Sequence, residues 1–362
     1  MQRTAAIFLL VAMVSVDTAA DETSGRIRFQ LGHEYDTNSM RVYHPEESDN
    51  LVRAIVEGLL QHEADRHRLM LNYQGGLKLF YNQSSEDLLA NRLKGTYRFT
   101  ASDNWHIGGR AAFRDTVLEQ HDRDYRLMIG ELYARTRLLS WLDAELMAGG
   151  KYFLFKPDEY GDYSLRFSYA GPLAGLRFHL LSAREVSTTL FYQVELRFFD
   201  DQAMSFSNGQ FLPTGPKRMD IRHIGGLQVR QQIRYWENRR LILELSYLVS
   251  VNDSKNAGSS AVWHRVRGLI SMQMPFATLH LMGTLQFTGY PDGIYVEGDL
   301  YEPEADENEN SLVIRVSIPL SDQLGLVLQG AVYRNDFNSS ELDVGTFGRE
   351  TVMLGLVCDL SL

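Results

Sequence analysis

The sequence is poor in cysteine, in lysine and in long apolar runs. Its single cysteine, Cys358, excludes a disulfide-bonded scaffold and a cysteine-rich metal site. There are 6 Lys against 30 Arg, and the formal net charge is −10. This acidic balance argues against a nucleic-acid partner, because neutralising phosphates requires a basic surface. After residue 20, no apolar run reaches the ~20 residues that a membrane-spanning helix needs.

The amino terminus carries a predicted signal peptide, residues 1–20. Met1-Gln2-Arg3 forms a short basic start, residues 5–16 are apolar, and Ala19-Ala20 provides small residues at the cleavage position. An amphipathic first helix is the alternative, but the stretch lacks a polar face. No cysteine lies nearby, which argues against lipoprotein processing. We therefore expect export to the periplasm, with residues 21–362 forming one domain.

Apolar residues recur at every second position almost from end to end of the chain. The pattern is clear in 105–114, 241–251, 279–287 and 352–362. Such alternation is typical of strands with one apolar face. The runs exceed the ~5–6 residues of a usual globular strand and suit the ~9–11 residues of a tilted strand in a membrane barrel.

The connections between these runs alternate in length. Short turns are expected at 62–66, 102–104, 139–141, 182–185, 236–239, 274–277 and 320–323, and longer polar segments near 36–50, 82–87, 116–124, 156–162, 200–218, 252–260, 290–310 and 335–348. Fifteen connections join sixteen strands, with fourteen or eighteen left open. We predict an all-β fold, a single antiparallel transmembrane barrel with short periplasmic turns and longer extracellular loops. A soluble β-sandwich or β-propeller is the alternative, but no blade repeat is found.

Aromatic residues are expected to form two girdles at the membrane interfaces. Four tyrosines fall at the long-loop ends of the predicted strands, and three tryptophans at the short-turn ends. These residues are Tyr35, Tyr81, Tyr125, Tyr290, Trp105, Trp141 and Trp236.

Arginines concentrate at the alternate strand positions that lie on the side opposite the apolar residues; we call each of the two alternating sets of positions a parity. If the apolar parity faces lipid, this second parity faces the lumen, since a cation near the lipid midplane costs about 2–4 kcal/mol. The predicted lumen-lining residues are Arg98, Arg110, Arg114, Arg166, Arg197, Arg230, Arg234, Arg265, Arg267 and Arg315. Further cations expected on this parity are Arg26, Arg28, Arg68, Lys78, Arg92, Lys94 and Arg222. The acids expected there are fewer, namely Glu57, Asp143, Glu145, Glu195, Glu244 and Asp359.

Two interpretations of these arginines stay open. Guanidinium groups form planar, bidentate pairs with carboxylate, phosphate or sulfate, so they could select anions in a pore. Alternatively, they pair with acids of the protein and brace the barrel wall.

A run of carboxylates lies in the long segment 290–310. The predicted acidic loop comprises Glu297, Asp299, Glu302, Glu304, Asp306, Glu307 and Glu309. It is interpreted as a solvated loop, as a site for a divalent cation shared with lipopolysaccharide, or as a plug folded onto the arginines. Its spacing does not match the twelve-residue calcium loop, so no metal ligand is assigned.

No catalytic constellation emerges from the sequence. His62, Glu63 and His67 come near the zinc-protease spacing, but the second histidine is one residue late and the segment is a turn. The four Gly-Gly pairs lie inside predicted strands, which excludes nucleotide-binding loops. Cys358 falls on the lipid-facing parity. We therefore predict no enzyme and no cofactor.

The export signal, the alternating strands and the terminal strand together resemble the Gram-negative outer-membrane β-barrels, porin-like in size. The last residue, Leu362, departs from the aromatic end usual in that class. The resemblance implies passive passage of small solutes through the outer membrane, with lipids, lipopolysaccharide and the barrel-insertion machinery as partners. The segment 34–38, Glu-Tyr-Asp-Thr-Asn, is similar to an element of barrels linked to surface polymer or lipoprotein export. The alternative is therefore a structural or export component of a cell-surface machine, with envelope-machine partners.

Overall fold

Sixteen antiparallel strands form one closed barrel in the computed structural model. The structure describes residues 22–39, 47–118, 124–155, 168–181, 185–207, 210–236, 239–257, 259–289, 310–335 and 347–361. The strands are β1 (Glu22–Asp36), β2 (Asp49–Ala64), β3 (His67–Phe80), β4 (Leu88–Ser102), β5 (Trp105–Leu118), β6 (Tyr125–Leu139), β7 (Leu142–Phe155), β8 (Tyr169–Leu181), β9 (Val186–Ser207), β10 (Gln210–Trp236), β11 (Arg239–Ser254), β12 (Ala261–Gln273), β13 (Thr278–Gly289), β14 (Asn310–Pro319), β15 (Leu324–Asn335) and β16 (Phe347–Ser361). The predicted fold class and strand number are confirmed.

The barrel closes by pairing its first strand with its last. The register of β1 and β16 runs from Arg26 opposite Ser361 to Asp36 opposite Thr351. All the other strand pairs join strands that are neighbours in the chain. Closure leaves no sheet edge along the wall, so backbone donors and acceptors are satisfied by strand pairing.

The wall has two faces of opposite character, and β1 shows both. Gln30, Glu34 and Asp36 are buried, whereas Phe29 and Leu31 on either side of Gln30 are exposed, Leu31 to 60%. Since side chains alternate along a strand, the same contrast continues around the barrel. We call the side that carries Gln30 the polar face and the side that carries Leu31 the apolar face.

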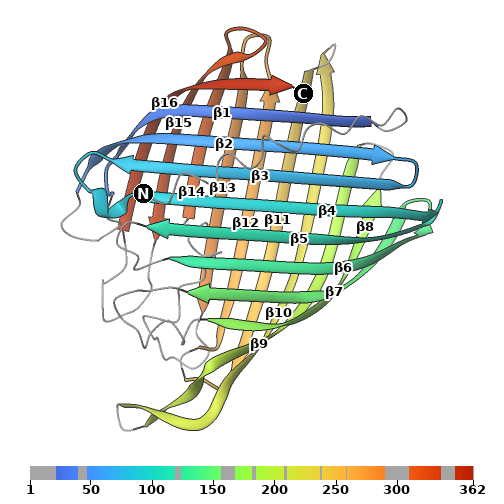
Figure 1. The fold of residues 1–362 in the computed structure, drawn as a ribbon, viewed down its shortest axis with the longest axis vertical. Helices are drawn as coiled ribbons and strands as arrows, with labels where there is room; N and C mark the ends of the chain where they lie inside the picture. The colour runs from blue at the N-terminus through green and yellow to red at the C-terminus, as the bar shows by residue number, and fades with distance from the viewer. Residues whose placement is uncertain are drawn as a thin grey trace.

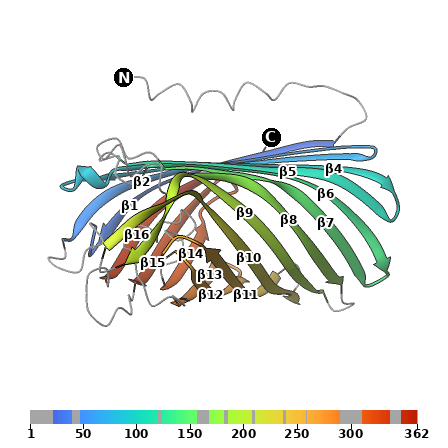
Figure 2. The ribbon, with the colours of Figure 1, turned by 90° about the horizontal axis from the view of Figure 1, so that it is seen from below.

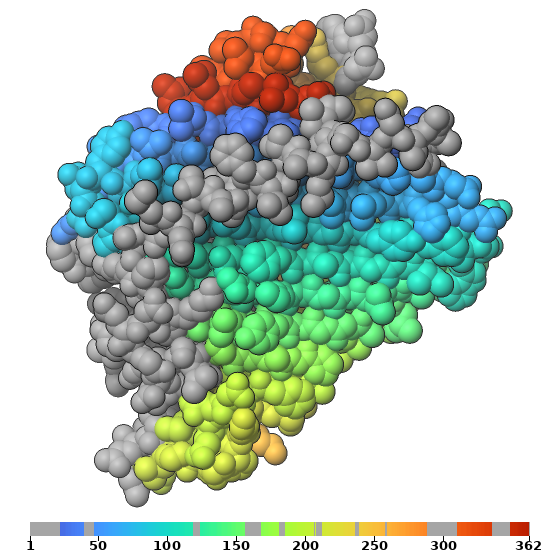
Figure 3. Space-filling model, viewed as in Figure 1, coloured from blue at the N-terminus to red at the C-terminus, as the bar shows by residue number. Residues whose placement is uncertain are grey.

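The strands are strongly tilted. In Figure 1, β1 to β8 run across the front, and β11 to β14 run behind them at a steep angle. Figure 2 shows these two groups of strands as opposite walls. The space-filling view in Figure 3 shows the front strands side by side as one continuous surface.

Helical structure is sparse in the described part of the chain. Within the described ranges the one helical segment is the 3-10 turn η2 (Ser84–Glu86), between β3 and β4. No helix among the described residues is long and apolar enough to cross a membrane.

The segment 200–218, expected as a loop, is instead a β-hairpin. β9 and β10 continue past the strands beside them, and they are the longest strands, with 22 and 27 residues. The pairing of β9 with β8 ends at Phe199, and that of β10 with β11 ends at Asp220. Beyond these points the two strands pair with each other and project from the wall, yellow-green at the bottom of Figure 1. Residues 212–217 of β10 are exposed at consecutive positions, so both faces of that strand meet solvent, and this exposure explains the polar composition that indicated a loop.

Four residues of the predicted aromatic girdles have the exposure that the prediction requires, whereas the prediction is wrong for a fifth residue. Tyr35, Tyr81, Trp105 and Trp141 are exposed. Tyr125 is instead fully buried on the polar face, where its ring lies 5.9 Å from that of Phe153. Tyr290 and the side chain of Trp236 lie outside the described residues.

Two inward glycines mark places where neighbouring backbone approaches the wall closely. A Cβ added to Gly149 of β7 would lie 1.9 Å from the carbonyl oxygen of Gly130. A Cβ added to Gly171 of β8 would lie 1.7 Å from that of Leu196. Neither backbone oxygen could move without breaking the strand pairing. These positions therefore require glycine for steric reasons.

We expect Gly171→Ala to lower the free energy of unfolding by about 1–3 kcal/mol, the usual cost of overpacking. Gly150→Ala is the matched control, because the nearest atom to its added Cβ is an ordinary 3.7 Å away. Unfolding in detergent, followed by circular dichroism against denaturant concentration, measures both. Equal stability of the two variants would contradict the steric requirement.

Candidate functional site

The polar face is the concave side of the wall, because its side chains reach across strands. Lys78 on β3 binds Glu34 on β1 at 2.9 Å, and Arg110 on β5 binds Glu145 on β7 at 2.7 Å. In each case a whole strand lies between the partners. Side chains converge in this way only inside a curved sheet. The candidate functional surface is therefore the inner wall.

A first cluster of ion pairs braces β5 to β8. The guanidinium of Arg110 donates two hydrogen bonds to the buried carboxylate of Glu145, at 2.8 and 2.7 Å. Arg177 donates to the same carboxylate at 3.2 Å, and both arginines lie within 4 Å of Glu131. Arg110 also lies over the ring of Tyr133, 4.1 Å from its centroid. Charge-assisted, bidentate pairs of this kind are strong and directional.

A second cluster joins β1 to its neighbours near the long-loop end. Arg349 of β16 makes a bidentate pair with the fully buried Asp36, at 2.9 and 2.6 Å. Glu34 accepts hydrogen bonds from Arg53 at 3.0 Å and from Lys78 at 2.9 Å. Asn38 donates to the carbonyl of Gly348 at 3.1 Å. The segment 34–38 thus ties together β1, β2, β3 and β16, which gives its acids a structural role.

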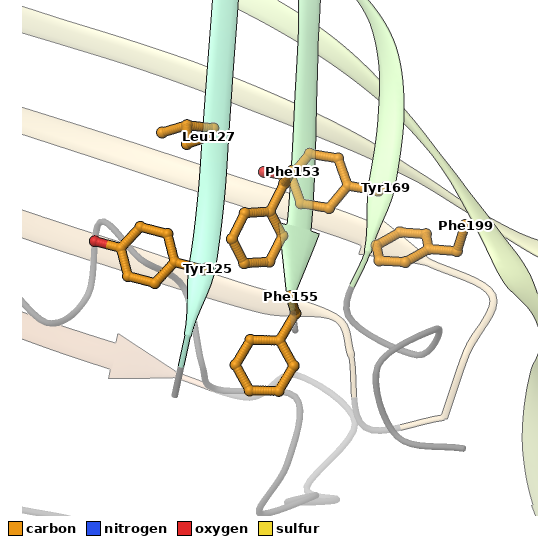
Figure 4. Packing of buried hydrophobic residues seen from close by; sticks show 6 residues of the cluster. All are labelled: Tyr125, Leu127, Phe153, Phe155, Tyr169 and Phe199. Carbon is orange, nitrogen blue, oxygen red and sulfur yellow. The ribbon is translucent and has the colours of Figure 1, made fainter. Parts of the chain in front are cut away.

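A row of aromatic side chains lines the inner wall from β6 to β9. The rings of Phe153 and Tyr169, and those of Tyr169 and Phe199, lie 5.4 Å apart at a tilt, as Figure 4 shows. Cations cover the row: Arg197 lies 4.7 Å from the centroid of Tyr169, and Arg218 lies 4.1 Å from that of Phe199. Cation–π contacts therefore stabilise these arginines within the wall.

The ten predicted arginines have different surroundings. Arg110, Arg197 and Arg234 form ion pairs, with Glu145, Glu195 and Glu185 respectively. Arg265 donates to Gln286 at 3.1 Å, Arg315 donates to Gln30 at 2.9 Å, and Arg114 lies 5.4 Å from the centroid of Tyr125. The Nε of Arg98 is buried without a hydrogen-bond partner among the described residues. Arg166 and the whole acidic loop, from Glu297 to Glu309, lie outside the described residues.

Arg230 and Arg267 are exposed on the inner wall. Neither forms an ion pair or hydrogen bond with any side chain in the described part of the chain. Arg230 lies on β10 and Arg267 on β12, with β11 between them. Among the ten predicted arginines, six thus lie in two regions of the wall: Arg110 and Arg114 on β5, and Arg230, Arg234, Arg265 and Arg267 on β10 and β12.

The sequence reasoning missed several buried acids of the inner wall. Glu34, Asp36 and Asp220 are all buried there. Asp220 accepts hydrogen bonds from Arg218, Asn252 and Ser254. A signal for the first two was present, since Glu34 and Asp36 have the same parity as Arg26 and Arg28.

The histidines of the zinc-like motif bind different hydroxyl groups. His62 lies 2.9 Å from the hydroxyl of Thr23, and His67 lies 2.6 Å from that of Tyr97. Within the described ranges, no group of three or more His, Cys, Asp or Glu side chains is placed to hold a metal ion.

The sequence matches no family model and no curated protein. Among solved structures, the outer-membrane porin OmpF of Salmonella typhi, determined with daunomycin, matches with a TM-score of 0.50 and 9% identity over 94% of this chain and 97% of that chain. The chain has the fold of the outer-membrane β-barrel proteins. CdiB from Acinetobacter baumannii matches with a TM-score of 0.50 and 9% identity over 92% of this chain. The present chain spans 60% of the length of that CdiB chain.

We expect Glu145→Ala to destabilise the barrel by about 1–3 kcal/mol, because it leaves the half-buried guanidinium groups of Arg110 and Arg177 without their main counter-charge. Glu63→Ala is the control, since Glu63 is half exposed and lies 4.0 Å from Arg68. Denaturant unfolding in detergent micelles measures the difference. A loss from Glu145→Ala no larger than that from the control would contradict the bracing role.

Proposed function

We propose that the protein is an outer-membrane channel, porin-like, through which small anionic solutes pass passively along a lumen lined by arginine. The observation that supports this most is the closed barrel, with an apolar outside and an inner wall where Arg230 and Arg267 are exposed and unpaired among the described residues.

The apolar face supports an outer-membrane location. Large apolar side chains are exposed around the whole barrel, including Leu132, Leu285, Phe287 and Leu354. Exposing this apolar surface to water would be unfavourable, whereas contact with lipid tails would not. In outer-membrane barrels the short turns face the periplasm and the longer loops face outward. We infer the same orientation here, after export directed by residues 1–20.

The anionic preference rests on incomplete neutralisation of the inner wall. Arg110 and Arg349 are held by buried carboxylates, so their charge is largely compensated. Arg230 and Arg267 lack such partners in the described structure. Unpaired cations along a low-dielectric wall raise the local concentration of anions. The described side chains form no catalytic constellation, so we propose passive transport without a cofactor. Expected partners are the outer-membrane lipids, lipopolysaccharide and the barrel-insertion machinery.

A second candidate function is a barrel component of a cell-surface machine. The β9–β10 hairpin favours it, because this hairpin projects beyond the neighbouring strands and so offers a surface for another protein. Its β9 strand is held to the segment that follows β11, since the amide of Met204 donates to Asn256 at 2.7 Å. A component of this kind should be closed alone and copurify with envelope proteins.

Reversal potentials in a planar bilayer under a salt gradient test the proposed function. We expect the protein to be anion-selective, and Arg267→Glu and Arg230→Glu to lower the ratio of anion to cation permeability several-fold, because each reverses a charge on the pathway. Lys217→Glu is the control, since Lys217 lies on the projecting hairpin and is paired with Asp200.

Cation selectivity of the unaltered protein would contradict the anionic preference. A protein that inserts but does not conduct would contradict the channel itself and favour the machine component.

A further inference from the structure

A cavity on the inner wall is surrounded by four cationic side chains. It has a volume of about 190 Å³ and lies against β2 to β5. Arg53, Lys78, Arg92 and Arg114 come from four successive strands to line it. No carboxylate is among the described residues that line this cavity. None of the sequence patterns indicated that these side chains share one space.

Small residues provide the space between the cations. Gly76 of β3 lies between Ile55 on β2 and Ala90 on β4 in the register of the sheet. A Cβ added to Gly76 would meet no atom within 4 Å, so the wall is open at this point. On one side of this row lie Arg53 and Lys78, which are paired in register. One step along the same face, on the other side, lie Arg92 and Arg114.

The positive charge around the cavity is only partly compensated. Arg53 and Lys78 share one carboxylate, that of Glu34. Arg92 and Arg114 lie directly opposite each other in the pairing of β4 with β5. Arg92 forms no ion pair or hydrogen bond with any side chain in the described ranges. Arg114 has further contacts within the structure, whereas a bound anion would give Arg92 the counter-charge that it lacks among the described residues.

A buried hydroxyl group gives independent support for a ligand. Thr116 is 6% exposed, and its Oγ1 has no hydrogen-bond partner in the described structure. It lines an adjoining cavity of about 150 Å³, which shares Lys78, Leu88, Ala90 and Arg114 with the first. That second cavity also contains the carboxylate of Glu86, so the more cationic first cavity is the better anion site. A buried hydroxyl without a partner is costly, and an anion held by Arg114 would accept a hydrogen bond from it.

We propose that Arg53, Lys78, Arg92 and Arg114 form a binding site for a compact oxyanion with two negative charges, for which hydrogen phosphate and sulfate are the probes. Such an anion accepts hydrogen bonds in several directions, which suits cations placed on both sides of Gly76. Guanidinium groups match its oxygens in bidentate geometry, and the charge of the site favours a dianion over chloride. The inference deepens the proposed function, because this site would concentrate one class of anion on the wall of the channel.

Equilibrium binding to the full chain in detergent tests the site directly. Phosphate and sulfate are titrated at constant chloride concentration by isothermal titration calorimetry. We expect Arg92→Gln to weaken binding roughly tenfold or more, since it removes a charged donor. Gly76→Leu should weaken binding by filling the cavity without changing any charge. Arg68→Gln is the control, as it removes the same charge from β3 about 33 Å along the strand from Lys78.

Two results would overturn the site: no binding of either dianion above the chloride background, or equal binding by the unaltered protein, Arg92→Gln and Gly76→Leu. Using both variants guards against a loss of binding through misfolding, because Arg92→Gln leaves the packing of the row around Gly76 unchanged. Conductance is measured on the same samples. An anion-selective channel without dianion binding refutes this site alone, whereas dianion binding without conductance refutes the channel and keeps the site.

Discussion

Closure of the sheet between β1 and β16 is the constraint on which the rest of the structure depends. A strand edge in hydrocarbon would leave backbone donors and acceptors unsatisfied, at a cost of several kcal/mol each. Pairing the first strand with the last removes that edge. Closure also makes the register of every strand depend on that of its neighbours, because a slip of one residue would exchange the apolar and polar faces. The buried ion pair of Arg349 and Asp36 joins these same two strands, so an ion pair adds to the backbone hydrogen bonds that hold β1 against β16.

The sequence predicted the architecture well because alternation and loop length are local signals. Strand number followed from counting connections, and the Gly-Gly pairs were correctly placed inside strands. Partners across strands were harder to predict. The parity of Glu145 was visible in the sequence, but its simultaneous contact with Arg110 and Arg177 depends on the curvature of β5 to β8. Tyr125 was assigned to a girdle from its position at a strand end, although its parity places it inside. The hairpin at 200–218 was missed because polarity indicates solvent and cannot separate a loop from a strand with two wet faces.

The two interpretations of the arginines apply to different residues. Arg110 and Arg349 are braces, since each makes a bidentate pair with a buried carboxylate. Arg197 is held by an aromatic ring as well as by Glu195. Arg92, Arg230 and Arg267 have no such restraints among the described residues, and the functional proposals depend on them. A count of charges by parity treats these groups as equivalent, whereas burial and partners separate them.

The preference for arginine over lysine has a consequence for how the inner wall responds to acidity. A guanidinium group keeps its proton at any pH that a protein survives, so most positive charges on this wall are permanent. Lysine is the cation that could lose its proton in an alkaline medium, and it is rare in this chain, with 6 residues against 30 arginines. The charge that the arginines carry stays constant as the medium changes, so the cationic character of the wall is a fixed property of the fold.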